Sequence, residues 1–354
     1  MSYLTHPPNY INPPSEGWKV TDTGLVTVSF AFATVFARCY TKFFLVKTPG
    51  WDDLLIVLAL IAAIGRLTAD MVGTHHFGSG RHTWDIPPNY YNGYLITTAV
   101  DGYLYVIAIS LAKLSLLLYL YRIFWVDKKF RIASWILGTI VALWATITIF
   151  LAIFSCRPVT ASWNMTQRLD PKTVCNPKSY DVENAYGFCN VISDLVLVFL
   201  PIPCIYNMQM NMKKKLGVAL VFATGLFICA VAIVRQYIAY TTGQTTDPSW
   251  EINKIKVWMA LEVNIAIIVA CLPALSPLFK RLPQLSSLVP SSIRERFSHA
   301  SAVERAPWPQ KLSGPTGDLE QGGEAAKGLP TNVSWRQPQA WRDAEKKEFN
   351  KMVI

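Results

Sequence analysis

Residues 94–124 read YLITTAVDGYLYVIAISLAKLSLLLYLYRIF, and this stretch decides the fold class. Its apolar run is longer than the ~20 residues that a helix needs to cross the hydrocarbon core of a bilayer. It also carries two charged residues, Asp101 and Lys113, which a helix that faces lipid would not tolerate. The stretch therefore predicts a membrane-spanning helix that turns a charged face toward other helices.

Six further stretches are long and apolar enough to span a bilayer, and the seven together predict an all-α bundle of seven transmembrane helices. Backbone amides in lipid must be satisfied within a helix or a closed barrel, and a barrel would show short alternating strands instead. Composition agrees, because 52% of the residues are hydrophobic and only 16% are charged, against ~25% in soluble domains. The predicted spans are Gly24–Val46, Asp53–Val72, Tyr94–Phe124, Ile132–Ser155, Ala185–Met208, Leu216–Tyr240 and Ile255–Phe279.

The apolar runs divide the chain into a leading tail (1–23), a membrane domain (24–280) and a trailing segment (281–354). The leading tail lacks the basic and apolar regions of a cleaved signal peptide, so we expect the first span to act as the anchor. The trailing segment is rich in Ser, Pro, Gly, Gln and mixed charge, which predicts a mostly disordered cytoplasmic tail. Within it we expect an amphipathic, surface-lying turn only at Leu285–Phe297.

Positive residues gather beside alternate connections, and Lys and Arg are retained on the cytoplasmic side of a membrane. They are Arg38, Lys42 and Lys47 at the first connection, Arg122, Lys128, Lys129 and Arg131 at the third, Lys213, Lys214 and Lys215 at the fifth, and Lys280, Arg281, Arg294 and Arg296 after the last span. We therefore expect the N-terminus outside and the C-terminus in the cytoplasm. The net charge of +10 then indicates anionic membrane lipid as a partner, and no nucleic acid.

Two features of the fourth connection agree with this orientation. Asn164-Met165-Thr166 is an N-glycosylation sequon, which is usable only on the extracellular or lumenal face. Cys156 and Cys175 are the only cysteines in a predicted loop, where an oxidising compartment would allow a disulfide. A second sequon begins at Asn332 in the predicted cytoplasmic tail and should stay unmodified. The cysteines in the spans are interpreted as packing residues, with Cys189 as a further oxidisable thiol: Cys39, Cys189, Cys204, Cys229 and Cys271.

Six charged residues fall at a common depth in the predicted helices, about 5 to 13 Å below the outer boundary at ~1.5 Å per residue. They are Arg66, Asp70, Asp101, Asp194, Arg235 and Glu262. Charges at membrane depth almost always face the interior of a bundle, so we expect one outward-open polar cavity that binds a ligand. Arg66 and Asp70 are spaced i, i+4, which predicts a local ion pair on one helix face.

Outside that local pair, the acids of this layer outnumber the cations. Asp101, Asp194 and Glu262 share a single remaining cation, Arg235, while Lys113 lies alone and deeper. At least one carboxylate is therefore expected to lack a partner, and an unpaired acid in a membrane is more often functional. The three acids are candidate catalytic residues, and a purely structural salt-bridge network is the alternative.

A series of short motifs runs in a fixed order along the spans. They are Trp51-Asp52-Asp53, Lys113-Leu114-Ser115, Leu118-Tyr119, Tyr121-Arg122-Ile123-Phe124, Cys156-Arg157-Pro158, Trp163, Cys175, Asp194, Leu200-Pro201-Ile202-Pro203, Lys213 to Lys215, Phe222, Gly225, Arg235, Glu262, Pro273 and Pro277. Over residues 24–285 this order resembles the fungal rhodopsin-like domain family of seven-helix membrane proteins. The resemblance implies receptor-like pathogenicity proteins or proteins of secondary-metabolite clusters, such as the membrane protein of the satratoxin cluster.

No cofactor is expected, in spite of the family's name. A retinal Schiff base needs a lysine in the middle of the seventh helix, but Lys254 and Lys256 lie at the predicted outer mouth of that helix. We expect no metal site either, because His75 and His76 are adjacent and no cysteine or carboxylate cluster accompanies them. The two prolines near the inner end of the last span, Pro273 and Pro277, and the pair at Pro201 and Pro203 are expected to kink their helices.

Two functions fit this pattern. In the first, the chain is a receptor-like sensor of a small molecule, or an accessory membrane component of a secondary-metabolite pathway of the mycotoxin type. A cytoplasmic signalling partner would then read helix movement at the basic loops and tail. In the second, it is an intramembrane isomerase or cyclase that uses a carboxylate for acid–base chemistry on a hydrophobic intermediate. A transporter is disfavoured because no internal repeat is visible. The membrane is either the plasma membrane or an endomembrane.

Overall fold

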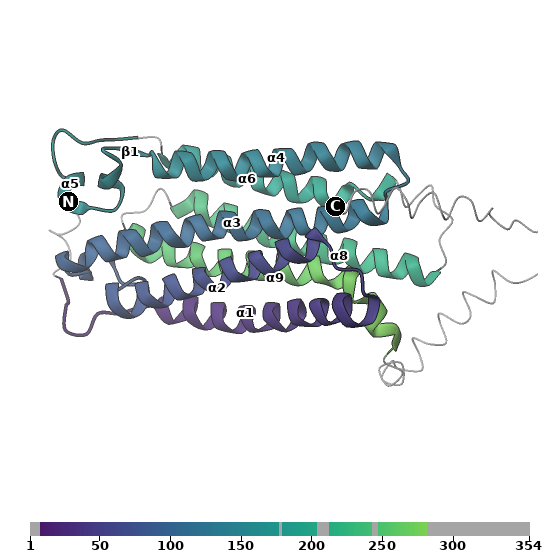
Figure 1. Ribbon diagram of the computed structural model, residues 1–354. Coiled ribbons are helices and arrows are strands. Elements are labelled where there is room, and N and C mark those ends of the chain that lie inside the picture. The colour runs from purple at the N-terminus through teal and green to yellow at the C-terminus, as the bar shows by residue number, and fades with distance from the viewer. Residues whose placement is uncertain (1–7, 177–178, 204–211, 243–246, 282–354) are drawn as a thin grey trace, which may run out of the picture. The chain divides into compact units, whose positions relative to one another are not determined.

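The computed structural model describes residues 8–176, 179–203, 212–242 and 247–281, and seven helices among them are long and apolar enough to cross a membrane (Figure 1). They are α1 Gly17–Tyr40, continued by the π-helical turn η2 Thr41–Val46, α2 Trp51–Phe77, α3 Tyr91–Ile123, α4 Lys128–Ile153, α6 Ser179–Phe199, α8 Met212–Thr242 and α9 Pro248–Arg281. The prediction of a seven-helix, all-α membrane bundle is confirmed. The predicted tail from residue 282 onward, including Leu285–Phe297 and Asn332, lies outside the described residues, as does Cys204.

Two helices, α3 and α9, hold the bundle together. Helix α3 packs against α2, α4 and α9, while α9 packs against α1, α2, α3 and α8. Small residues at these contacts let the helices approach closely, which is the usual basis of helix association in lipid, where apolar burial gives no advantage. The fully buried alanines of this core are Ala31, Ala59, Ala108, Ala112 and Ala270.

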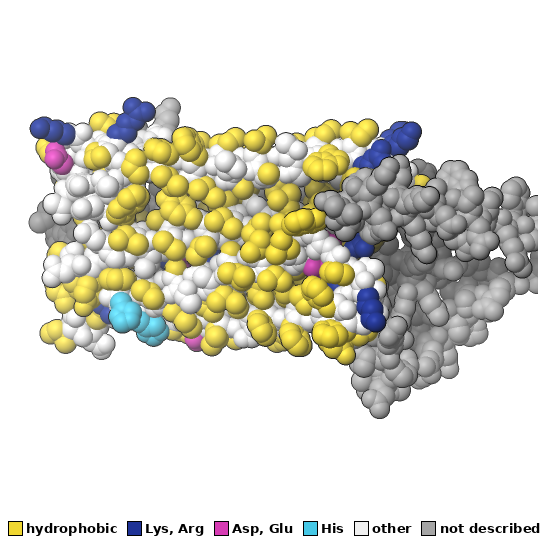
Figure 2. Space-filling view, viewed as in Figure 1, with side chains coloured by type: hydrophobic (Ala, Val, Ile, Leu, Met, Phe, Trp, Pro, Cys, Tyr) yellow, Lys and Arg dark blue, Asp and Glu magenta, His cyan; other side chains and the backbone are white. Residues whose placement is uncertain are grey.

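The outer surfaces of the helices are apolar, as lipid contact requires. Helix α4 is the least buried of the seven, and side chains such as Trp135, Ile140 and Phe150 stand exposed along it. Figure 2 shows hydrophobic side chains along the length of one face, with Lys and Arg gathered near its ends. That distribution matches a hydrocarbon belt between two polar interfaces.

The four prolines of the predicted kinks lie at or near helix ends, and the kinks themselves stay predictions. Helix α6 ends at Phe199, a turn follows at Leu200 and Pro201, and the chain is helical again at Ile202 and Pro203, so the helix is interrupted at this pair of prolines. Pro273 and Pro277 lie within α9. Because Pro277 has no N–H, the carbonyl of Pro273 loses its helical donor, and the hydroxyl of Tyr119 donates to it at 3.0 Å.

One end of the bundle, called here the disulfide end, is closed by a stapled loop. Cys156 and Cys175 form the predicted disulfide, which joins the strands β1 (Cys156–Arg157) and β2 (Val174–Cys175). Between them lie the short helices η5 Val159–Ser162 and α5 Met165–Arg168. The backbone N–H of Met165 donates to the side chain of Asn92 at 2.8 Å, which fixes this loop to the start of α3.

The connection between α2 and α3 is fastened to the start of α9 at the same end. It contains the short helices η3 Thr83–Asp85 and η4 Pro88–Tyr90. The imidazole of His82 stacks on Trp84 and Trp250 and contacts Asp247 at 2.5 Å, while Thr83 donates to Asp247 through its N–H and its hydroxyl. Partial burial raises the pKa of Asp247, but the hydrogen bonds from His82 and Thr83 outweigh it and place the pKa below its ordinary value of 3.8.

Glycosylation of the disulfide loop tests the predicted orientation. Asn164 is partly exposed and caps the start of α5, and glycans are added only on the lumenal face. After expression in a fungal host, glycosidase treatment should increase the electrophoretic mobility of the wild-type chain and leave Asn164→Gln unchanged. Asn332→Gln is the matched control and should behave like the wild type. A glycan on Asn332 in place of Asn164 would reverse the orientation.

Candidate functional site

Twelve charged side chains are buried within the described spans, and they form three clusters of two cations and two carboxylates each. The near quartet, closest to the disulfide end, consists of Arg66, Asp70, Asp101 and Lys256. The middle quartet consists of Lys113, Asp194, Arg235 and Glu262. The far quartet consists of Arg38, Lys42, Asp52 and Asp53. Each quartet is electrically neutral, which is how buried charges become tolerable in lipid.

The near quartet is built around the guanidinium of Arg66. It contacts Asp101 on α3 at 2.7 Å and Asp70, one turn away on α2, at 3.4 Å. The i, i+4 ion pair that the sequence predicts is therefore confirmed. The ammonium of Lys256 contacts the second oxygen of Asp70 at 3.2 Å. Lys256 was expected at the mouth of the seventh helix, but α9 begins at Pro248 and so carries this residue two turns into the bundle.

The middle quartet joins four helices through two short ion pairs. Arg235 on α8 contacts Glu262 on α9 at 2.6 Å, and Lys113 on α3 contacts Asp194 on α6 at 2.8 Å. The prediction that Lys113 lies alone is therefore wrong. Depth counted along single helices could not show that the long lysine side chain spans the gap between α3 and α6.

Two neutral side chains link the pairs of the middle quartet. The amide of Asn190 accepts a hydrogen bond from Lys113 and donates one to Glu262, both at 2.8 Å. The hydroxyl of Tyr105 donates to Glu262 at 2.9 Å. The two ion pairs are thereby one connected network, in which movement of any helix changes the contacts of the others.

The far quartet was missed by sequence reasoning, which interpreted Arg38 and Lys42 only as topology signals. Arg38 lies between Asp52 and Asp53, at 2.5 and 2.9 Å, and Lys42 contacts Asp52 at 3.3 Å. Asp53 also accepts the N–H of Gly50 and so caps α2. The adjacent acids of the motif Trp51-Asp52-Asp53 were the available signal, because two carboxylates at a span end need buried cations nearby.

Helices α3 and α9 contribute to all three quartets. In the near and middle quartets they supply charged partners, and in the far quartet they supply neutral ones. The Tyr119 ring lies 5.6 and 5.1 Å from the cations of Arg38 and Lys42, and Arg38 donates to the carbonyl of Ala270 at 2.6 Å. The hydroxyl of Ser115 donates to the carbonyl of Asp52. Both helices therefore connect the three quartets along the bundle.

The prediction of an outward-open polar cavity is wrong for this conformation. The side chains expected to line it contact one another, and Asp101, Asp194 and Glu262 are 2%, 4% and 0% exposed. The expected carboxylate without a partner is also wrong, because each of these acids pairs with a cation. Oδ1 of Asp101 and Oδ2 of Asp194 are buried without a hydrogen-bond donor among the described residues. Oδ1 of Asp101 is in ionic contact with Arg66 at 2.7 Å, whereas no ion pair of the described residues involves Oδ2 of Asp194.

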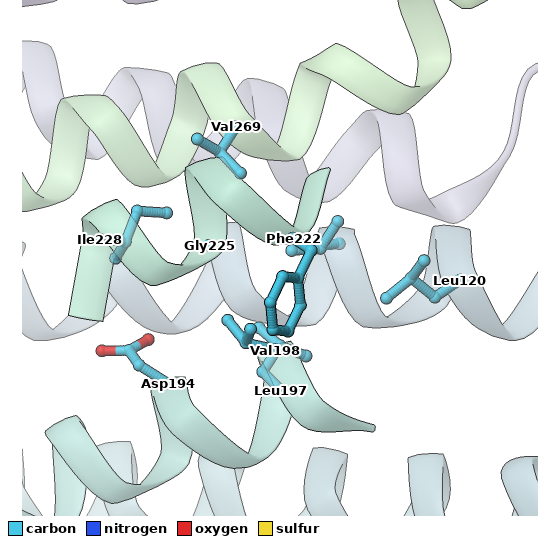
Figure 3. A pocket seen from close by; sticks show the side chains of 9 residues that line it. Leu120, Asp194, Leu197, Val198, Phe222, Gly225, Ile228 and Val269 are labelled. Carbon is cyan, nitrogen blue, oxygen red and sulfur yellow. The ribbon is translucent and has the colours of Figure 1, made fainter. Parts of the chain in front are cut away.

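That oxygen belongs to a residue that lines a small cavity of about 40 Å³. Figure 3 shows Asp194 at one end of the lining and Leu120 at the other, with Phe222 between them. The remaining lining residues are apolar and come from α3, α6, α8 and α9: Leu116, Leu197, Val198, Gly225, Ile228 and Val269. The cavity therefore lies beside the middle quartet, on the side toward the far quartet.

The buried lysine of α9 does not suit a retinal Schiff base. The ammonium of Lys256 is in ionic contact with Asp70, and the residue is 2% exposed, whereas a Schiff base needs its lysine nitrogen free to bond the aldehyde carbon. Lys254 is exposed and pairs with Glu251. The absence of bound retinal stays a prediction. Among the described residues no group of three His, Cys, Asp or Glu side chains could hold a metal ion, and His75 and His76 stand exposed in the last turn of α2.

Seven membrane-length helices around buried ion pairs define a multi-pass integral membrane protein. The sequence model of the fungal rhodopsin domain matches residues 37–281, which is more than half of the chain. The chain therefore belongs to the fungal rhodopsin domain family. No solved structure matches it.

Named relatives cover similar stretches of the chain. A SAT4 family membrane protein of Emericella nidulans is 26% identical over 278 residues, which are 73% of this chain and 62% of that protein. The satratoxin biosynthesis SC1 cluster protein 4 of Stachybotrys chartarum is 24% identical over 68% of this chain and 89% of its own length. The receptor GIN3 of Arthrobotrys oligospora is 23% identical over 62% of this chain and 51% of its own length. The match thus spans less than two thirds of the first relative.

A double-mutant cycle tests the middle quartet. Arg235→Met leaves Glu262 as an uncompensated buried charge and should lower the free energy of unfolding by about 3–5 kcal/mol. Adding Glu262→Met removes both charges and should recover a large part of that loss, as measured by denaturation in detergent. The exposed pair Lys254 and Glu251 on the same helix is the control, and the same substitutions there should cost at most about 1 kcal/mol. Additive losses at Arg235 and Glu262 would contradict the pairing.

Proposed function

We propose that this chain is a receptor-like sensor of a small hydrophobic molecule that is produced in secondary metabolism. The observation that carries the proposal is the chain of three neutral quartets along α3 and α9. A ligand that rearranges the middle quartet must shift helices that also hold the near and far quartets. Ion pairs between helices exchange between discrete arrangements, so such a shift can act as a switch.

The names of two relatives support the proposed sensor function. One is named as a receptor, and another is named for satratoxin biosynthesis. Identities of 23% and 24% leave ligand and partner free to differ, so both roles are carried to this chain only as proposals. A sensor encoded for a biosynthetic pathway would detect a product or intermediate that dissolves in the membrane.

We place the readout of the sensor at the far quartet. The far quartet lies at the turn between η2 and the start of α2. This turn is beside the connections that carry the predicted cytoplasmic lysines and arginines. A signalling partner would contact these basic loops, together with anionic lipid. The proposal holds for the plasma membrane and for an endomembrane, because both give the same topology.

The second candidate is an intramembrane enzyme, and one observation favours it. Asp194 lines an apolar cavity, and one of its oxygens has no hydrogen-bond donor among the described residues. Such a place is one where a carboxylate can exchange a proton with a hydrophobic substrate. Against it, Asp194 is paired with Lys113, and the other two acids are closed off by partners. A sensor needs only binding beside the quartet, whereas an enzyme also needs access to the reacting atoms.

One experiment separates the two candidates. The purified chain in lipid nanodiscs is incubated with lipophilic fractions of fungal culture extracts, and its thermal stability and the fate of each compound are measured together. A sensor should be stabilised by a compound that is recovered unchanged, by about 2.7 kcal/mol at a concentration 100 times the dissociation constant. Conversion of the compound, lost in both Asp194→Asn and Glu262→Gln, would establish the enzyme and overturn the sensor.

A further inference from the structure

The chemistry of the cavity beside Asp194 indicates which ligands it can hold. Asp194 is the only polar residue among the nine that line it, and its Oδ2 is buried without a hydrogen-bond donor among the described residues. A buried acceptor without a donor is costly, so an occupant that donates one hydrogen bond is favoured. A buried water is held poorly here, because it needs two to four polar partners.

The charge of the middle quartet decides between the possible donors. Lys113 and Arg235 already balance Asp194 and Glu262, so the quartet is neutral. An ammonium group at Oδ2 would add an uncompensated positive charge in the membrane interior, and a carboxylate or phosphate would be repelled by Asp194. A neutral hydroxyl supplies the missing donor without changing the charge.

The lining also indicates how the ligand arrives. Val198 on α6 and Phe222 on α8 line the cavity and are only partly buried, so we place the entry from lipid at the wall that these two side chains form. The helices touch closely there, because a Cβ at Gly225 would lie 2.6 Å from Cγ2 of Val198. The cavity of about 40 Å³ accommodates a hydroxyl and the first few carbons. A longer molecule must part α6 and α8 for the rest of its chain to extend between them.

We propose that this cavity binds the hydroxyl end of a neutral, membrane-soluble alcohol, which enters from the bilayer between α6 and α8 and donates a hydrogen bond to Asp194. This rests on the proposed function and names its ligand class. Asp194 also forms the ion pair with Lys113 that joins α6 to α3. A hydroxyl that donates to Asp194 therefore competes with Lys113 for the same carboxylate. Ligand binding and the ion pairs of the quartet are thereby coupled.

Photolabelling in nanodiscs tests this proposal. The probe is octanol that carries a diazirine at the third carbon, and labelled residues are mapped by mass spectrometry. We expect enriched labelling of the cavity residues Leu197, Val198 and Phe222 over the lipid-facing residues of α4. At equal concentrations in the membrane, unlabelled octanol should compete about tenfold more strongly than octane or octylammonium, because only octanol supplies a neutral donor.

Two substitutions on one helix provide the matched control. Val198→Phe fills the cavity and should abolish the enriched labelling, whereas Val196→Phe adds the same ring on the exposed face of α6 and should preserve it. If Val198→Phe does not fold, Val269→Phe on α9 fills the same cavity from the opposite wall.

The wild-type map alone can overturn the proposal. Labelling without enrichment at the cavity, or equal competition by octane, would show that no hydroxyl site exists beside Asp194. Stronger competition by octylammonium would show that the site takes cations. Each of these results would overturn the alcohol site alone. The proposed sensor function would still hold if a lipophilic compound stabilised the protein, so the two proposals can fail separately.

Discussion

Neutralisation of buried charge is the constraint on which the rest of this structure depends. A lone charge in the hydrocarbon core costs several kcal/mol, and the described part of this bundle buries twelve charges. Each lies in a quartet of two cations and two carboxylates, so no cluster carries net charge. Because the partners come from different helices, neutralisation also dictates which helices must touch. Helices α3 and α9 supply charged partners to the near and middle quartets and neutral partners to the far quartet, which accounts for their central places.

The same constraint explains why the fold could be predicted from the sequence and the site only partly. Long apolar runs identify the seven spans independently of tertiary contacts, and an i, i+4 spacing is enough to pair Arg66 with Asp70. Pairs between helices have no such local signature. The sequence placed Lys113 at another depth from Asp194, yet a lysine side chain is long enough to bring its ammonium to that carboxylate.

Helix ends account for the remaining differences. A span that begins at Ile255 places Lys256 at the mouth of its helix, but the helix begins at Pro248, where the ring of a first-turn proline is tolerated. Arg38 and Lys42 sit where α1 passes into a π-helical turn, so they were taken for interfacial charges although Asp52 and Asp53 bury them. Charge near a span end therefore has two interpretations, and only the acids across the turn distinguish them.

We expect the buried carboxylates of this bundle to be ionised as well as paired in the membrane. Infrared spectroscopy of the protein in lipid measures this directly, because a protonated carboxyl group has a C=O stretching band that an ionised carboxylate lacks. At neutral pH we expect none of the three acids to contribute such a band. The spectrum in this region should therefore lose no protonated-carboxyl band in Asp101→Asn, Asp194→Asn or Glu262→Gln. A protonated-carboxyl band lost in any one of these variants would contradict the pairing of that acid.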